Sequence, residues 1–450
     1  MSFELTSDKI SEFKNALEHG EVKGLGLILK DLHPADIADV IERVDHEDAY
    51  LLLQEFEDAM VADILVELEE DVRIQILKSY TGKEIAEELV ENLDSDDAAD
   101  ILSELPEAKK REVLSNLEDV ETAKQLADLL THAENTAGAL MATELVKVNE
   151  NWTVRHCVRE MRKQAEEIEE VHAVYVVDDN EVLLGRLSLK KLLTTSTKTP
   201  VKEVFTPKVT QVTSTTPAED VANLMERYDM VVVPVVDDMG RLLGRITIDD
   251  VVDVIKEEAE RDYQLASGIT DDVDLGSNLI QVTKARLPWL LIGLMGGLIS
   301  ASVISTQEAR LADLPKLAFF IPLIAAMGGN VGVQSSAIVV QALANKNLGI
   351  TVFQRLLKEV SVGLVNGLIC SVILYSITAF AGVEYTLATT ISLSLFLVIM
   401  FASLFGTSVP LLLDKWNIDP AVATGPFITT ANDVFGLFIY FSIGKLIFGF

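Results

Sequence analysis

Cysteine, histidine and the usual catalytic motifs are scarce in this sequence of 450 residues. Its two cysteines, Cys157 and Cys370, exclude a disulfide-stabilised scaffold and agree with a reducing compartment. The six histidines are scattered, so they form no zinc-type ligand set. A nucleophile elbow, a Walker A loop and a dinucleotide fingerprint are all missing, so we expect neither an enzyme nor an ATP-driven pump.

Basic residues are also few, since 37 Lys and Arg stand against 70 Asp and Glu, a net charge of −33. The deficit lies in residues 1–285, with 29 Lys and Arg, 63 Asp and Glu and a net charge of −34. Residues 286–450 carry a net charge of +1. An acidic surface excludes nucleic acid as a partner and favours cations or basic partners. With no apolar signal core at the N-terminus, we expect the acidic half to stay in the cytoplasm.

Long apolar runs fill the second half of the chain, and each is long enough to cross a bilayer. The five runs are Leu287–Gln307, Leu317–Ala344, Val360–Val383, Tyr385–Leu413 and Pro420–Gly444. Five such runs in succession are not typical of a soluble domain. The basic residues in the connecting loops favour a cytoplasmic N-terminus, and an odd number of spans then places the C-terminus outside.

Two of the runs contain polar residues. "MGGNVGVQSS", Met327 to Ser336, suits either close helix packing or the lining of a pore. In "PFITTANDVFG", Pro426 frees a backbone carbonyl one turn earlier as a potential ligand. An ionised Asp433 in mid-membrane costs ~2.5–3.5 kcal/mol, and the five runs contain no Lys, Arg or His to pair with it. Three explanations for this acid remain open: it binds a metal ion, it carries a transported proton, or it is protonated and has no function.

A repeat of offset 59 lies in the acidic half. "VYVVDDNEVLLGRLSLKKLL" begins at Val174, and "VPVVDDMGRLLGRITIDDVV" begins at Val233. Each copy predicts a strand, an Asp-Asp turn, a second strand ending in Gly-Arg and the start of a helix, with a further helix before it. The two copies resemble a tandem pair of CBS domains, which often bind adenine nucleotides.

The first 135 residues are helical by their periodicity. An Ala-Asp-apolar-apolar pattern recurs at Ala38–Ile41, Ala62–Leu65 and Ala99–Leu102, which predicts a superhelical stack of short antiparallel helices. Asp96, Asp97 and Asp100 form an acidic cluster, with Ser95 as the expected N-cap. N-capping accounts for one of these acids but not for the overall acidic excess.

The order of these parts, with "GGNVGVQSS" and "TTANDVFG", resembles the MgtE-type magnesium channels over essentially the whole chain. The fold implied is multidomain: an all-α superhelical N domain (1–135), an α/β tandem CBS pair (136–262), a linking helix (263–284) and an all-α transmembrane domain with five helices (285–450). The resemblance implies a homodimer in the cell (inner) membrane. Its helices form a Mg²⁺ pore on the two-fold axis, and cytosolic Mg²⁺ closes it.

The resemblance also implies particular site residues. Asp433 of each subunit would face the central ion, and the pore set is Asp433, Asn432, Thr429 and Asn330. The regulatory metal ligands would be Asp63, Asp96, Asp100, Glu219, Asp229, Asp250, Asp253, Glu258 and Asp419. Arg261 stands where relatives have an acid, which leaves the number of regulatory sites open. Ligation by carboxylates alone favours hard ions such as Mg²⁺ or Ca²⁺.

Two other functions remain open. One is a proton-coupled divalent cation transporter, with Asp433 as the proton carrier and ATP bound at the CBS pair as a regulator. The other is a membrane-anchored receptor or scaffold, which leaves Asp433 unexplained. The sequence does not decide between Mg²⁺, Co²⁺, Mn²⁺ and Ni²⁺, nor whether ATP binds.

Overall fold

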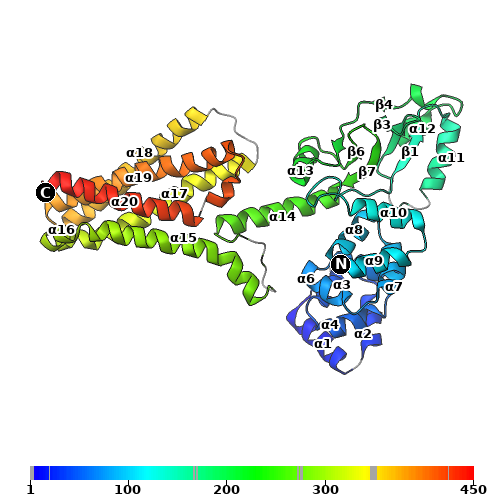
Figure 1. Cartoon of the computed structure of the whole chain (residues 1–450), viewed down its shortest axis with the longest axis horizontal. Coiled ribbons are helices and arrows are strands. Elements are labelled where there is room, and N and C mark those ends of the chain that lie inside the picture. Colours follow the sequence, from blue (N-terminus) through cyan, green and yellow to red (C-terminus); the bar gives the residue numbers. More distant parts are fainter. Residues whose placement is uncertain are drawn as a thin grey trace. The chain divides into compact units, whose positions relative to one another are not determined.

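The computed structural model describes residues 5–19, 21–165, 168, 171–270, 273, 277–344, 352–423 and 425–449 (Figure 1). Contacts between Cα atoms divide the chain into two compact units, Met1–Lys256 and Glu257–Phe450. Each unit is described by itself.

Short helices build the N-terminal part of the first unit, as the periodicity predicts. The Ala and apolar positions of the recurring pattern are buried, for example Ala62, Ile64 and Leu65, while the Asp of each copy is exposed. Helices two apart in the chain pack together, such as α3 with α5 and α4 with α6, which makes the stack superhelical. The elements are α1 (Ser7–Glu18), α2 (Val22–Leu29), α3 (Pro34–Ile41), α4 (His46–Leu53), α5 (Asp58–Val66), α6 (Glu70–Leu77), α7 (Gly82–Glu84), η1 (Ile85–Leu89), η2 (Val90–Asn92), α8 (Ser95–Glu104), α9 (Glu107–Asn116) and α10 (Val120–Leu129).

The predicted repeat forms two small α/β domains, each with its own sheet, in strand orders β1-β2-β3-β4 and β5-β6-β7. The first domain contains β1 (Val146–Asn149), α11 (Val154–Gln164), β2 (Val174–Val177), β3 (Leu183–Leu187), α12 (Leu189–Thr194), η3 (Val201–Glu203) and β4 (Thr206–Pro207). The second contains β5 (Val212–Thr213), α13 (Ala218–Arg227), β6 (Val232–Val236), β7 (Leu242–Thr247) and α14 (Ile248–Ala266).

The two copies also share their strand register. Val176 pairs with Gly185 in the first copy, and Val235 pairs with Gly244, 59 positions later, in the second. In both copies a bulge follows the Val, and the next Asp accepts two backbone N–H bonds that close the turn. The predicted Asp-Asp turn is therefore confirmed, with its first Asp as the turn-forming residue.

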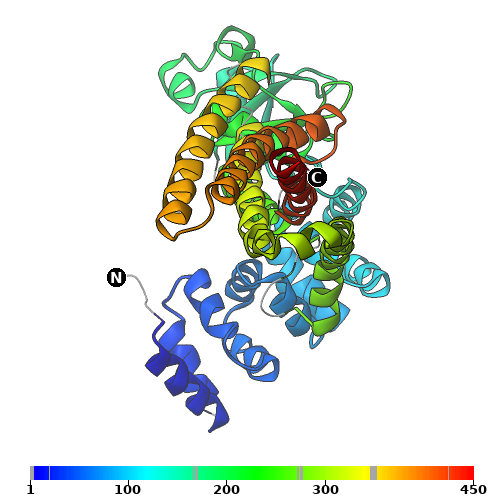
Figure 2. The ribbon, with the colours of Figure 1, turned by 90° about the vertical axis from the view of Figure 1, so that its left-hand side faces the viewer.

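Within the described residues, the second unit contains five helices that are long and apolar enough to span a membrane, as predicted. In Figure 2, which looks toward the helix ends, α18 lies at the edge of the bundle beside α19. The elements are α15 (Leu279–Ser305), α16 (Glu308–Asp313), η4 (Pro315–Phe320), α17 (Ile321–Ala344), α18 (Val352–Phe380), α19 (Tyr385–Lys415), η5 (Pro420–Ala423) and α20 (Gly425–Phe448).

Two boundaries differ from the predictions. The last spanning helix begins at Gly425 and not at Pro420, so Pro426 lies in the first turn, where the missing N–H has no helical partner to lose. Of the expected linking helix over 263–284, residues 271, 272 and 274–276 lie outside the described residues, and the helical residues on either side belong to other elements. Helix α14 continues through residue 262 to Ala266, a turn follows in which Gly268 has a φ of +81°, and α15 begins at Leu279.

Candidate functional site

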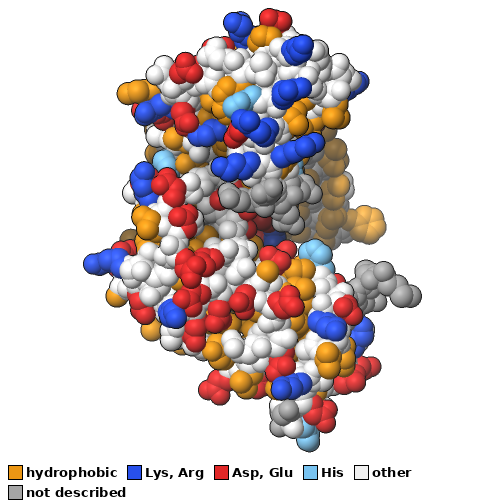
Figure 3. Space-filling view, turned by 90° about the vertical axis from the view of Figure 1, so that its right-hand side faces the viewer, with side chains coloured by type: hydrophobic (Ala, Val, Ile, Leu, Met, Phe, Trp, Pro, Cys, Tyr) orange, Lys and Arg blue, Asp and Glu red, His pale blue; other side chains and the backbone are white. Residues whose placement is uncertain are grey.

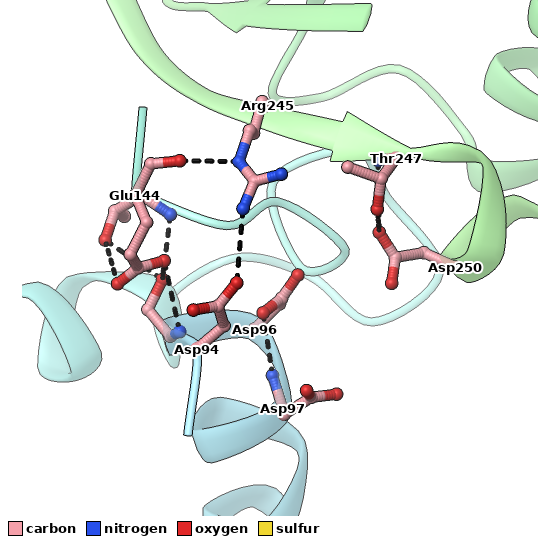
Figure 4. A network of polar contacts seen from close by, with 9 residues as sticks. Asp94, Asp96, Asp97, Glu144, Arg245, Thr247 and Asp250 are labelled. Atoms are coloured by element: carbon pink, nitrogen blue, oxygen red, sulfur yellow. Dashed lines mark hydrogen bonds and ion pairs between the residues drawn. The ribbon is translucent and has the colours of Figure 1, made fainter. Parts of the chain in front are cut away.

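Three carboxylates approach one another where the helical stack meets the second CBS copy. Asp96 and Asp97 lie in the first turn of α8, and Asp250 lies in the first turn of α14 (Figure 4). Thr247 donates both its backbone N–H and its hydroxyl to Asp250 Oδ2, at 3.1 and 2.7 Å. These bonds hold the Asp250 carboxylate on the side of α14 that faces α8.

The electrostatics of this cluster favour a cation. Burial, followed by the charge on Asp250, raises the pKa of Asp96 well above its usual range and the pKa of Asp97 to about 7. Burial also raises the pKa of Asp250, although the Thr247 bonds act against it. Among the described residues, no ion pair reaches these three acids; Arg245, the nearby guanidinium, pairs with Asp94 instead. A divalent cation would relieve this repulsion directly.

A network of hydrogen bonds and one ion pair joins the start of α8 to β7 and to the loop before β1 without a metal. Arg245, only 7% exposed, donates from Nε to the Glu144 carbonyl at 2.5 Å and from a terminal nitrogen to Asp94 Oδ2 at 3.1 Å. Glu144 Oε2 accepts the Ser95 N–H at 3.2 Å and the Ser95 hydroxyl at 2.8 Å. The expected N-cap role of Ser95 is therefore wrong. Asp94 occupies the N-cap position, and Ser95 is the first helical residue, bonded across to Glu144.

The described residues contain no group of three or more His, Cys, Asp or Glu side chains arranged to hold a metal ion. Mg²⁺ keeps most of its water shell and needs only one or two carboxylates, whereas zinc-type ions need three or four direct protein ligands. The facing pair of Asp97 and Asp250, repelling each other and built only from oxygen donors, fits that requirement.

The other predicted regulatory acids lie apart from this cluster. Asp100 is on α8, one turn after Asp96 and Asp97, and its charge also raises the pKa of Asp97. Glu258, beyond the boundary of the first unit, pairs with Arg261 at 3.7 Å. The remaining acids are exposed: Asp63 on α5, Glu219 on α13, Asp229 just after α13, Asp253 on α14 and Asp419 before η5.

Charge is divided across the surface of the first unit. Figure 3 shows Asp and Glu gathered over the helical stack, and Lys and Arg gathered over the CBS part of the same face. Exposed basic residues on α11 contribute to the second patch: Arg155, Arg159, Arg162 and Lys163. The attraction for cations therefore belongs to the helical stack and to the start of α14.

The membrane unit brings two of the four predicted pore residues together. A Cβ added to Gly329 of α17 would lie 3.0 Å from Thr429 Cγ2 and 3.7 Å from Asp433 Oδ1, so both side chains face this glycine. Asn330, the next residue on α17, is exposed. No charged group among the described residues acts on Asp433.

Asn432 points elsewhere. Its side chain is 1% exposed, and a Cβ added to Gly332 would lie 1.9 Å from its Nδ2 atom. The glycines of "MGGNVG" therefore serve close packing of α17 against α20, and the same surface also carries the neighbours of Asp433. The close-packing interpretation of the motif is confirmed for Gly332, whereas the pore-lining interpretation stays a prediction.

Sequence reasoning missed one membrane acid. Glu359 immediately precedes the predicted run Val360–Val383, but α18 begins at Val352, so Glu359 is inside the helix. Its Oε1 accepts the hydroxyl of the buried Ser335 at 2.5 Å. One turn earlier, Arg355 donates to the Ile338 carbonyl at 3.1 Å. The signal available in the sequence was the polar "QSS" that ends the α17 motif.

The turn after α14 packs against the base of α20. A Cβ added to Gly268 would lie 2.7 Å from Pro426 Cγ, and one added to Gly425 would lie 2.5 Å from the Ala266 carbonyl. Thr270 donates its N–H and its hydroxyl to the Ala285 carbonyl of α15, both at 3.0 Å. The end of α14 is thus fixed to the start of the helix that carries Asp433.

Comparison with known proteins defines the class. Residues 321–443 match the family described as a divalent cation transporter, residues 32–135 match the MgtE intracellular N domain, and residues 137–197 and 201–257 match the CBS domain. The fold and these matches together define a divalent cation transporter with a CBS pair.

Individual relatives narrow this further. The magnesium transporter MgtE of Thermus thermophilus is 37% identical over 329 residues, 72% of this chain and 73% of the relative. That of Enterococcus faecalis is 37% identical over 327 residues, 72% of each chain. A solved cytosolic domain of the Mg²⁺ channel MgtE, in complex with ATP, aligns with a TM-score of 0.50 and 34% identity over 54% of this chain and 99% of that one. The chain belongs to the MgtE family.

Proposed function

We propose that this protein is a homodimeric Mg²⁺ channel of the cell membrane, with a cytoplasmic N-terminus and a gate closed by Mg²⁺ on its acidic domains. In this proposal residues 1–135 and 136–262 form the sensor, residues 263–284 connect it to the membrane, and residues 285–450 form the pore. The observation that carries the proposal is Asp433, which lies within a spanning helix and has no charged partner among the described residues.

The pore residues in this proposal are Asp433, Thr429 and the exposed Asn330; Asn432, next to Asp433 on α20, is buried against Gly332 and does not line the pore. Two Asp433 carboxylates on a two-fold axis offer a charge of −2 to one divalent ion. Mg²⁺ demands ~2.1 Å octahedral geometry and dehydrates reluctantly, so such a ring binds it through its waters. Conduction requires a site that is strong enough to bind the ion and weak enough to release it.

A second copy of the chain completes the pore. Support for a dimer comes from four exposed apolar side chains at equivalent places in the two CBS copies: Leu189 and Leu193 on α12, and Ile248 and Val252 on α14. The members of each matching pair are 59 positions apart. Repeated exposure of apolar residues on a soluble surface is typical of an interface.

The gate starts at the acid cluster. Without Mg²⁺, Asp96, Asp97 and Asp250 repel one another, and the helical stack is held by the Arg245 network and by the apolar core that it shares with the second CBS copy. Mg²⁺ between these acids draws α8 and α14 together. Helix α14 then carries the change to Gly268 and Pro426 at the base of α20. Asp63, Asp100, Glu219, Asp229, Asp253, Glu258 and Asp419 are proposed as further, weaker ligands.

ATP binding at the CBS pair is part of the proposal. The supporting observation is Tyr175, which is buried beside Leu242 of the other copy and whose hydroxyl has no hydrogen-bond partner among the described residues. The positive charges of Arg186 and Arg245 act on this hydroxyl. An anionic nucleotide suits a place where an unpaired hydroxyl lies within the field of two guanidinium groups. Calorimetry of ATP binding to wild type and Tyr175→Phe tests this point.

The test of the channel is Mg²⁺ flux into liposomes containing the full-length protein, with Asp433→Asn as the isosteric variant that removes the charge. We expect flux in the wild type, its loss in Asp433→Asn, and inhibition when Mg²⁺ is raised on the side of the acidic domains. Asp128→Asn, a change of an exposed acid on α10, is the matched control.

Two outcomes would contradict the proposal. Flux that persists in Asp433→Asn removes the assigned pore acid. Flux that appears only with a proton gradient favours the proton-coupled transporter instead.

A further inference from the structure

An enclosed polar site lies among α17, α19 and α20 in each membrane unit. A Cβ added to Gly406 of α19 would lie 2.3 Å from the Gly332 carbonyl of α17, and Gly332 itself touches the Asn432 amide of α20. The three helices therefore meet at backbone distance around Gly332. Hydrocarbon side chains do not separate them at this level.

Four polar atoms at this junction have no hydrogen-bond partner within the described residues. They are Asn432 Nδ2 and Oδ1, Ser336 Oγ and Thr407 Oγ1. Ser336 lies one helical turn after Gly332 on the same face, and Thr407 follows Gly406. All three side chains are almost fully buried within one chain, so neither lipid, pore water nor a second subunit reaches them without local movement.

Some other buried hydroxyls in the same unit bond to their own helix, although Ser371 and Ser392 also lack a partner among the described residues. Thr390 donates to the Thr386 carbonyl at 2.8 Å, and Ser394 donates to the Thr390 carbonyl at 2.7 Å. These are the usual bonds of a hydroxyl to its own helix. Ser336 and Thr407 do not make this bond, and near Gly332 they lie with an Asn432 amide whose two polar atoms are unpaired as well.

Leaving these atoms unpaired is unfavourable. A buried polar group without a partner loses its hydration and gains nothing in return, and no bulk water is present at membrane depth. The missing partner must both donate and accept, because the Nδ2 amide donates while Oδ1 accepts. No carboxylate contributes to the group, and the amide N–H₂ repels a cation, so a metal ion does not fit.

We infer that this junction is a binding site for ordered water, held by Asn432, Ser336 and Thr407 inside each subunit. A buried water with two to four polar partners is the ordinary solution for such a group. Asn432 is then a positioning residue. Its hydrated amide fixes the rotation of α20, and Asp433, the next residue, is directed toward Gly329 and Thr429. That last step rests on the proposed function, whereas the water site does not.

Replacing one hydroxyl by a methyl group tests the site, because the melting temperature should fall or rise depending on whether a water is bound. Thr407→Val keeps the shape of the side chain. If the hydroxyl bonds to water, we expect the melting temperature of the full-length protein in nanodiscs to fall by about 2–4 °C. If the hydroxyl is unpaired, the same change removes a desolvation penalty and the melting temperature rises, which would overturn the inference. Thr407→Ser retains the hydroxyl and serves as the matched control.

Coupling between the residues provides the second readout. Thr407→Val is expected to have a smaller effect in an Asn432→Leu background, because both changes remove partners of the same water. Additive effects would contradict a shared site. If Asn432→Leu does not assemble, the pair Ser336→Ala and Thr407→Val supplies the same cycle.

Direct observation completes the test. A density map of the full-length protein at water-resolving quality should show a peak about 2.7–3.2 Å from the Asn432 amide and from one of the two hydroxyls. Direct protein bonds to all four atoms, without such a peak, would overturn the inference. None of these measurements uses transport, so their failure is distinct from persistent flux in Asp433→Asn.

Discussion

Replacing Asp97 with Asn should stabilise the metal-free soluble unit at neutral and alkaline pH. The pKa of Asp97 lies at about 7 instead of 3.8, because burial and neighbouring acids disfavour its charge. Those acids are Asp94 and Asp100 on its own helix and Asp249 and Asp250 on the facing one. A difference of roughly three pKa units, at 1.36 kcal/mol each, corresponds to about 4 kcal/mol.

The sign follows from proton linkage. An acid whose pKa is raised by folding binds its proton more tightly in the folded state, so the wild type loses stability as the pH rises from about 4 to about 7. The Asn side chain does not titrate, so the stability of the variant does not fall with pH for this reason. The advantage of Asp97→Asn should therefore be near zero at pH 4 and approach about 4 kcal/mol at pH 8.

Urea unfolding of a fragment with residues 1–256, in EDTA at pH 5, 6, 7 and 8, measures this difference, and Asp128→Asn is the control for removing an exposed acid. Mg²⁺ should recover part of the stability in the wild type, about 1.4 kcal/mol at ten times its Kd, and less in the variant. A difference between Asp97→Asn and wild type that does not vary with pH would refute the reasoning. So would a variant that is less stable at pH 8.

Three further predictions concern single contacts. Gly332→Ala forces a methyl group into the Asn432 amide and should destabilise the membrane unit by about 1–3 kcal/mol, whereas Gly297→Ala, with nothing within 4 Å, should be neutral in the same thermal assay. Arg245→Met breaks the ion pair with Asp94 and should cost the 1–256 fragment about 2 kcal/mol in urea unfolding; a loss below about 0.5 kcal/mol would show that the network does not hold the helical stack. Cys157 is fully buried, and burial raises the pKa of its thiol to about 11, so iodoacetamide at pH 8 should label it only after unfolding; rapid labelling of the folded protein would contradict its placement.

The parts of the fold that the sequence predicts are those encoded by neighbouring residues. Each of three patterns could be recognised within a short stretch of sequence, and each is confirmed. They are the five apolar runs, the repeat at offset 59 and the Ala-Asp-apolar-apolar pattern. The helix boundaries were less accurate, because α20 begins and α14 ends near Gly425 and Gly268, which pack against Ala266 and Pro426 far away in the sequence.

Contacts between distant positions were not predictable in the same way. Arg186 and Arg245 occupy equivalent places in the two repeats, yet Arg186 is exposed and Arg245 is buried against Asp94, 151 positions earlier. Nothing in the Gly-Arg motif distinguishes them. The inward direction of the Asn432 amide likewise depends on Gly332, on another helix. The environment of Arg245 and that of Asn432 are both set by residues distant in the sequence.

The glycine contacts have a mechanical consequence for the membrane unit. Gly406 meets Gly332, Gly332 meets Asn432, and Gly296 of α15 meets Thr430, so four helices touch without long, pliable side chains between them. Such a block is stiff, and we expect it to rotate or translate as a single body. A push applied where Gly268 rests on Pro426 would then reach Asp433, seven positions further along α20, without being absorbed by bending.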